Sequence, residues 1–215
     1  MLRTGNILVD FFSQIIIFFP LIPVIIILFR GLYQKDALTF LLIICLLNFS
    51  QNLTLAILST DYVNEASIRN IFSLLEFILI VQIFKPAVRK RFKEPVDIIM
   101  IAILSSLITY YFLKGADQKV IFLDLFKNGF VILLISYCLV NVVKTENLQI
   151  FYSPLFWVAT GTLFCFVTAI LVYIVDDYHL HPSIMADKLL LLNIASVARY
   201  FFYALAGLLY NKSIK

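Results

Sequence analysis

The chain has 215 residues, of which 62% are hydrophobic and 14% are charged, whereas an ordinary soluble domain is roughly 45–50% apolar and about 25% charged. A soluble chain of this size could not bury so much apolar surface, so the composition excludes a soluble fold and indicates an integral protein of the lipid bilayer. The net charge of +4 is too small to indicate a nucleic-acid partner.

Seven apolar stretches reach or approach the length of a membrane-spanning helix, which is about 20 residues. In chain order they cover residues 10–29, 37–58, 69–84, 96–113, 120–143, 151–175 and 189–210. Helices follow because lipid offers no hydrogen-bond partners for the backbone. We therefore expect an all-α, polytopic membrane protein in which residues 1–215 form a single seven-helix transmembrane domain.

Two stretches contain residues that are unusual in a spanning helix. The first is interrupted by Pro20 and Pro23, and it lacks the strongly basic start and small-residue cleavage site of a signal peptide. We interpret it as a retained helix with a kink near its middle. The fifth has Asp124 and Lys127 three residues apart on one face, which we interpret as an amphipathic entry into the membrane.

Lysine and arginine in the short connections predict the orientation of the chain. The side with more of them holds Arg30, Lys35, Lys85, Arg89, Lys90, Arg91, Lys93, Lys144, Lys212 and Lys215, and the other holds Arg3, Arg69, Lys114, Lys119 and Lys188. We therefore expect the N-terminus outside and the C-terminus in the cytoplasm. The longest cytoplasmic connection, residues 84–94, is the expected contact for a cytoplasmic protein or for anionic lipid, at Arg89, Lys90, Arg91 and Lys93.

Two ionisable residues lie deep within predicted spans, where a charge costs about 2.5–3.5 kcal/mol and usually faces the bundle interior. Glu76 lies seven residues from the outer end of the third stretch, and Arg199 lies ten residues from the outer end of the seventh. At 1.5 Å per residue these depths are roughly 10 and 15 Å. Because each charge alone lacks compensation, we expect Glu76 and Arg199 to form a buried pair.

Other polar residues fall near the same depth and complete a candidate ligand or ion site. Ser73 shares a helical face with Glu76, and Ser196 and Tyr203 share a face with Arg199. In the second stretch the amide side chains are Asn48, Gln51 and Asn52. Three interpretations remain open: structural hydrogen bonding between helices at about 0.6–2 kcal/mol per bond, a ligand or ion site opening outward, and a catalytic site.

The connection after the sixth stretch holds both histidines of the chain. Asp176, Asp177, His179 and His181 are residue types that bind zinc or a similar ion, although an exposed polar loop has the same composition. The three cysteines, at positions 45, 138 and 165, lie in apolar runs, so we expect core residues and no structural disulfide. No nucleotide-binding or hydrolase motif occurs, and we expect no cofactor.

The segment Asn70–Phe77, which reads NIFSLLEF, and the Arg199–Tyr200 pair resemble the third and seventh helices of small, uncharacterised seven-helix bacterial membrane proteins. The resemblance covers these two spans and implies no known activity. It implies a role that Glu76 and Arg199 share, and it fits a location in the inner membrane of a bacterium.

Three functions follow from these features as hypotheses. The absence of catalytic motifs favours a non-enzymatic sensory or ligand-binding module with its site around Glu76 and Arg199. An alternative is a transporter or channel subunit that uses Glu76 as a proton or cation site, although no internal repeat is evident. A second alternative is a lipid-modifying enzyme that uses Glu76 or residues 176–181.

Overall fold

The computed structural model describes residues 7–33, 36–57, 62–115, 121–176 and 182–210, and this part of the chain contains helices and no strand. The elements are α1 (Ile7–Phe18), α2 (Leu21–Phe29), α3 (Asp36–Ile57), α4 (Tyr62–Phe84), η1 (Lys85–Ala87), α5 (Lys90–Lys114), α6 (Ile121–Glu146), η2 (Asn147–Tyr152), α7 (Pro154–Asp176) and α8 (Pro182–Leu209). The predicted all-α fold is confirmed.

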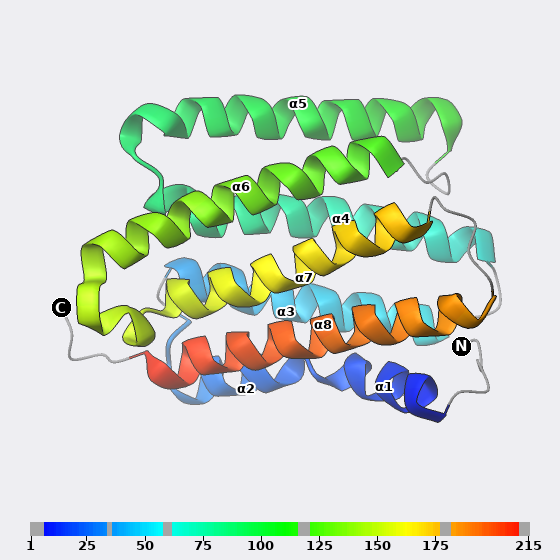
Figure 1. The fold of residues 1–215 in the computed structure, drawn as a ribbon, viewed down its shortest axis with the longest axis horizontal. Helices are drawn as coiled ribbons and strands as arrows, with labels where there is room; N and C mark the ends of the chain where they lie inside the picture. Colours follow the sequence, from blue (N-terminus) through cyan, green and yellow to red (C-terminus); the bar gives the residue numbers. More distant parts are fainter. Residues whose placement is uncertain (1–6, 34–35, 58–61, 116–120, 177–181, 211–215) are drawn as a thin grey trace.

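The helices α3 to α8 are each long and apolar enough to cross a bilayer, which makes the chain a polytopic membrane protein. They run alternately up and down one elongated bundle (Figure 1). The first predicted span is formed by two shorter helices, α1 and α2, whose apolar part covers Gln14–Phe29. α1 begins at the end of the bundle opposite to the end where α8 finishes (Figure 1).

The chain breaks between α1 and α2 at Pro20, and Pro23 lies in the first turn of α2, where the sequence predicts a kink. Proline has no N–H, so Pro20 cannot bond the carbonyl of Ile16 in the helical pattern. The Asn52 side chain of α3 replaces that donor, with its Nδ2 3.3 Å from the Ile16 carbonyl oxygen. The carbonyl of Phe19, which Pro23 cannot bond, accepts from the Ile22 N–H at 3.1 Å. The break therefore leaves neither carbonyl unpaired inside the membrane.

Packing is uneven across the bundle. α7 and α8 form the most extensive contact, followed by α3 with α4 and α6 with α7, while α1 and α2 lie against α8 and α3. α5 packs mainly against α6 and α4, and it forms one edge of the bundle in Figure 1. Completely buried side chains such as Leu41, Phe77, Ile80 and Ile135 fill the interior. Cys45 and Cys138 are buried among them, and Cys165 is half-buried.

Three helices begin earlier than the apolar pattern predicts. α4 starts at Tyr62, α5 at Lys90 and α8 at Pro182, because a helix continues past the apolar segment as long as its polar end can meet headgroups and water. The prediction of a basic loop is therefore wrong in one respect. Lys90, Arg91 and Lys93 belong to the first turn of α5, and only Arg89 precedes it as the N-cap.

Candidate functional site

An ion pair between α4 and α8 lies at the centre of the bundle. Arg199 Nη1 lies 2.6 Å from Glu76 Oε1, and the two side chains are 8% and 17% exposed respectively. The structure thus brings together the two deep charges that the sequence places at similar depths. Both charges are compensated by this contact, which is the condition for keeping them inside a membrane protein.

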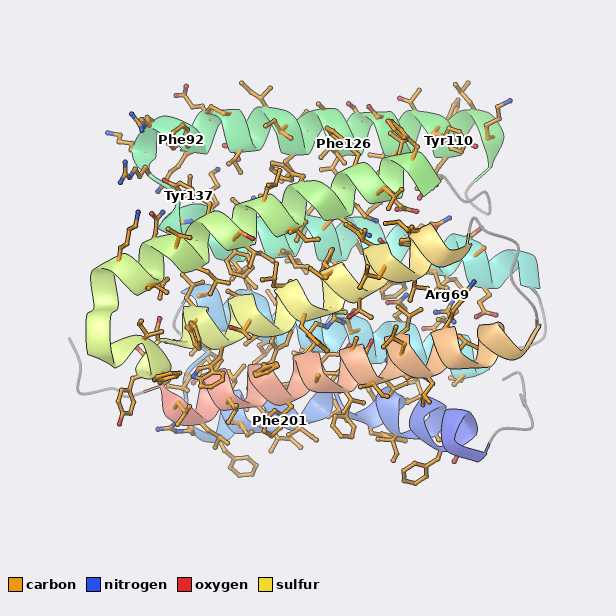
Figure 2. All side chains as sticks on the ribbon, viewed as in Figure 1. Arg69, Phe92, Tyr110, Phe126, Tyr137 and Phe201 are labelled. Carbon is orange, nitrogen blue, oxygen red and sulfur yellow. The ribbon has the colours of Figure 1, made fainter. Side chains whose placement is uncertain are left out.

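The helical faces explain why both side chains point inward. On α4, Phe77 and Ile80 beside Glu76 are buried, whereas Leu75 on the other side of the helix is exposed. On α8, Tyr203 is fully buried one turn after Arg199. Phe201, on the outer side of α8 in Figure 2, is 58% exposed.

Two tyrosines surround the guanidinium of Arg199. Arg199 Nη2 donates to the Tyr200 hydroxyl at 3.0 Å, and the Arg199 Cζ atom lies 5.0 Å from the ring centre of Tyr200 and 6.0 Å from that of Tyr203. The Tyr203 hydroxyl shares a 2.8 Å hydrogen bond with Thr162 of α7. Arg199 Nε is buried and has no hydrogen-bond partner in the described part of the chain.

The predicted amide residues of α3 have different partners. Asn48 Nδ2 donates to Glu76 Oε1 at 3.3 Å, so Asn48 belongs to the site. Asn52 bonds the Ile16 carbonyl instead, which is a structural role at the break between α1 and α2. Gln51 is half-buried. Within the described part of the chain, the side chains of Glu76 and Arg199 bond Asn48, Tyr200 and each other, and not Gln51. The amides at i, i+3 and i+4 therefore do not act as one cluster.

Ser73 accepts a hydrogen bond from a second buried ion pair, which Asp124 and Lys127 form on α6. Lys127 Nζ lies 2.8 Å from Asp124 Oδ1 on α6 and donates to Ser73 Oγ of α4 at 2.6 Å. The side chains of Lys127 and Asp124 are 6% and 13% exposed. The interpretation of this pair as an amphipathic entry is therefore wrong, because α4 covers the polar face of α6 at this level.

A glycine permits close contact between α7 and α8 beside the site. A Cβ atom on Gly161 would lie 2.8 Å from Phe202 Cβ and 3.1 Å from the Arg199 carbonyl oxygen. Small residues allow membrane helices to approach closely. Gly161 thus fixes the separation at which Thr162 of α7 reaches Tyr203 of α8. Ser196, the remaining predicted site residue, is half-buried on α8 and lies within hydrogen-bonding reach of Cys165.

The predicted metal ligands lie almost wholly outside the described residues. Asp177, His179 and His181 fall in the undescribed segment 177–181, and Asp176 is the last residue of α7. Within the described ranges, no group of three or more histidine, cysteine, aspartate or glutamate side chains could hold a metal ion.

Sequence reasoning omitted Tyr200, Thr162 and Lys127 from the site. Lys127 could have been included, because a lysine and an aspartate three residues apart in a span need the same compensation as Glu76 and Arg199. Thr162 gives no signal in the sequence, because its role depends on the close contact of α7 with α8. Comparison with protein-family models, curated proteins and solved structures finds no match for this chain.

Proposed function

We propose that the chain is a non-enzymatic, ligand-binding membrane module of the sensory kind, with its ligand site at Glu76 and Arg199. The observation that supports the proposal is the buried Nε of Arg199, which has no partner among the described residues. A buried N–H without an acceptor costs about 1–3 kcal/mol. If the ion pair were purely structural, this cost would have no compensation. A bound ligand with a carboxylate or carbonyl oxygen would remove the cost by accepting from the Nε–H.

Charge balance restricts the ligand. Glu76 and Arg199 compensate each other, so a ligand with a net charge would leave one buried charge unpaired. A small zwitterion, with an acceptor for Arg199 and a donor for Glu76, satisfies both residues and keeps the net charge at zero. Binding in this way replaces the direct contact between α4 and α8 with contacts to the ligand.

The chain that follows Glu76 provides a route for a signal. α4 ends at Phe84 and leads through η1 to the basic residues at the start of α5. A ligand that changes the position of α4 relative to α8 therefore changes the presentation of Arg89, Lys90, Arg91 and Lys93 to a cytoplasmic protein or to anionic lipid. In this proposal the chain crosses a bacterial inner membrane seven times, with its N-terminus outside.

The test is a thermal-unfolding measurement on detergent-purified protein with single neutral amino acids added. Acetate and methylammonium serve as singly charged comparisons. We expect at least one amino acid to raise the Tm, and neither comparison compound to do so. Absence of any shift across the amino acids, or an equal shift with acetate, would contradict the proposed ligand class.

Arg199→Lys locates the effect at the site. Lysine keeps the positive charge beside Glu76 but has no Nε–H, so the ligand-induced rise in Tm should disappear. Arg69→Lys is the matched control, because Arg69 pairs with Glu65 on the exposed surface of α4 and its replacement should leave the rise intact. A rise that persists in Arg199→Lys places the ligand elsewhere.

The second buried pair favours a transporter as the alternative function. Ser73, which accepts from Lys127, lies three residues before Glu76 on α4 and so shares its helical face. Ionisable side chains therefore extend from α6 across α4 to α8, an arrangement used by proton relays in membrane transporters. The discriminating measurement is proton or cation flux in proteoliposomes: transport requires a flux that Glu76→Gln abolishes, and sensing requires none.

A further inference from the structure

A groove between α5 and α6 lies apart from the Glu76 site, at the end of the bundle that includes η1. It has a volume of about 200 Å³ and is lined by Val88, Phe92, Val96, Phe130, Leu134 and Tyr137. Figure 2 labels Phe92 of α5 and Tyr137 of α6 in this region, at the end of the bundle where α5 begins. A volume of this size is smaller than most small-molecule sites, which occupy about 300–1,000 Å³, and it suits a segment of a hydrocarbon chain.

Tyr137 lines the groove with its ring, and its hydroxyl lies behind the surface of the lining. The hydroxyl of Tyr137 is buried and has no hydrogen-bond partner among the residues that the structure describes. The Tyr137 ring packs edge-on against Phe92, with 6.0 Å between the ring centres. A buried hydroxyl usually has a partner, because leaving it unpaired costs free energy. The hydroxyl does not face the groove, whose surface is entirely apolar, so the lining suits a hydrocarbon chain.

Positive charge is concentrated next to the groove. The Arg91 guanidinium lies over the Phe92 ring, with its Cζ 4.6 Å from the ring centre. Arg89 is the N-cap of α5, and its side chain makes no capping hydrogen bond. The first amides of α5 are therefore next to basic residues in the chain and are not capped by the Arg89 side chain. A helix N-terminus attracts anions through these amides and the helix dipole.

The nearby acids do not neutralise this charge. Lys85 Nζ lies 2.7 Å from Asp97 Oδ2, so these two residues compensate each other. The remaining basic residues of the segment, Arg89, Lys90, Arg91 and Lys93, face one acid, the exposed Glu94. The segment next to the groove therefore has a clear excess of positive charge.

We propose that this groove binds one anionic glycerophospholipid. Its phosphate lies at the N-terminus of α5 among Arg89, Lys90 and Arg91, and one acyl chain enters the groove against the ring of Tyr137. The apolar lining is the reason for choosing a lipid rather than a soluble phosphate compound: Val96 and Leu134 belong to the spanning parts of α5 and α6, where the surrounding medium is hydrocarbon. Basic pockets between spanning helices bind anionic lipid headgroups in this way.

The experiment measures lipid retained by detergent-purified full-length protein in native mass spectrometry. Dioleoyl phosphatidylglycerol is compared with dioleoyl phosphatidylcholine, which has the same chains and no net charge. We expect one phosphatidylglycerol to remain bound under conditions that remove phosphatidylcholine. Equal retention of the two lipids would overturn the proposal.

Two variants separate the headgroup from the acyl chain. Combining Arg89→Gln, Lys90→Gln and Arg91→Gln should weaken phosphatidylglycerol binding on the order of 100-fold, at about fivefold for each charge removed near the headgroup. Lys114→Gln, at the other end of α5, is the control and should leave binding unchanged. Retention of phosphatidylglycerol by the triple variant at the parent level would overturn the assignment of the phosphate.

Leu134→Trp fills the groove without changing charge and should abolish retention of phosphatidylglycerol. Leu133→Trp is the matched control, because Leu133 is the next residue on α6 and is 72% exposed. If Leu134→Trp does not yield monodisperse protein, Val96→Phe is the second variant, and it should lower retention by narrowing the groove that Val96 lines. Unchanged retention in the variant that folds would overturn the proposal.

Inorganic phosphate and sn-glycerol 3-phosphate distinguish a lipid from a soluble phosphate ligand. Neither should displace the bound phosphatidylglycerol at millimolar concentration, because neither has a chain for the groove. Displacement by either compound would mean that the site recognises the phosphate group without the acyl chain, and it would overturn the lipid assignment.

Discussion

The side chain of Arg199 has five N–H donors and no acceptor, so its surroundings determine whether it can remain buried. Glu76 and the Tyr200 hydroxyl accept from the two terminal nitrogens, while Nε has no partner in the described part of the molecule. In an ordinary buried ion pair we would expect every donor of the guanidinium to have a partner. The unpaired Nε–H is therefore the feature that favours a ligand site in our proposal. The sequence cannot reveal this feature, because it depends on atomic positions.

The two further ion pairs of α4 and α6 differ in burial and should differ in energetic importance. Lys127→Gln leaves the Asp124 carboxylate without its partner inside the bundle, and we expect the free energy of unfolding to fall by about 3–5 kcal/mol. Arg69→Gln removes an i,i+4 pair whose side chains are 58% and 38% exposed, and we expect a loss below about 1 kcal/mol. Denaturant unfolding in detergent measures both, and equal losses would contradict the burial of Lys127.

Residue-level prediction succeeded where few alternatives existed. Glu76 and Arg199 are rare charges at similar depths, so each was the obvious partner of the other. Ser73 and Asn52 share helical faces or spacing with site residues, yet they bond Lys127 and the Ile16 carbonyl. Their partners depend on which helices are neighbours and how each is rotated, and the spacing within one helix does not contain that information.

At the scale of the elements, the contact between α7 and α8 depends on a single small residue. Gly161→Ala would place a methyl group 2.8 Å from Phe202 Cβ and 3.1 Å from a backbone oxygen, which only a separation of the two helices relieves. We expect a loss of about 1–3 kcal/mol in the free energy of unfolding, as for other overpacked sites. The loss should include the Tyr203–Thr162 hydrogen bond, which spans the same contact.

Gly129→Ala is the matched control on α6. A Cβ atom at position 129 meets nothing within 4 Å, so the substitution should be neutral or should stabilise the helix by up to about 1 kcal/mol. Thermal unfolding of the two variants in the same detergent compares them directly. Equal effects of the two substitutions would show that Gly161 does not limit the approach of α7 to α8.

The break between α1 and α2 shows how much of a helix's structure can be predicted from the sequence. Pro20 and Pro23 predict an interruption because each removes a helical donor. They do not predict which group replaces the donor, and Asn52 does so from another helix. The early starts of α4, α5 and α8 were missed for a related reason, because hydropathy identifies the apolar segment and not the polar turns that extend it.

At the scale of the whole molecule, the ends of the bundle differ in charge. Lys85, Arg89, Lys90, Arg91 and Lys93 gather where α4 ends and α5 begins. At the same end, the Arg30 guanidinium donates to the carbonyls of Gly207 and Leu208 in the last turn of α8, where a cation stabilises the helix terminus. The positive-inside rule therefore predicts that this end faces the cytoplasm.

Reporter fusions test that orientation. A fluorescent protein that matures only in the cytoplasm should be bright when fused after Lys215, and a phosphatase that folds only outside should be active when fused before Met1 and inactive at the C-terminus. The same pair of reporters in the connection 116–120 should give the outside pattern. The reverse pattern at these positions would contradict the predicted orientation.

The central claim is that Glu76 and Arg199 form a buried ion pair between α4 and α8, and a double-mutant cycle tests it most directly. The free energy of unfolding in detergent is measured for the parent, Glu76→Gln, Arg199→Leu and the double variant. We expect each single substitution to cost about 3–5 kcal/mol, since it leaves a buried charge unpaired, and the double variant to cost clearly less than the two losses combined. Small, additive losses would contradict the account, because they would mean that the two charges are solvated independently of each other.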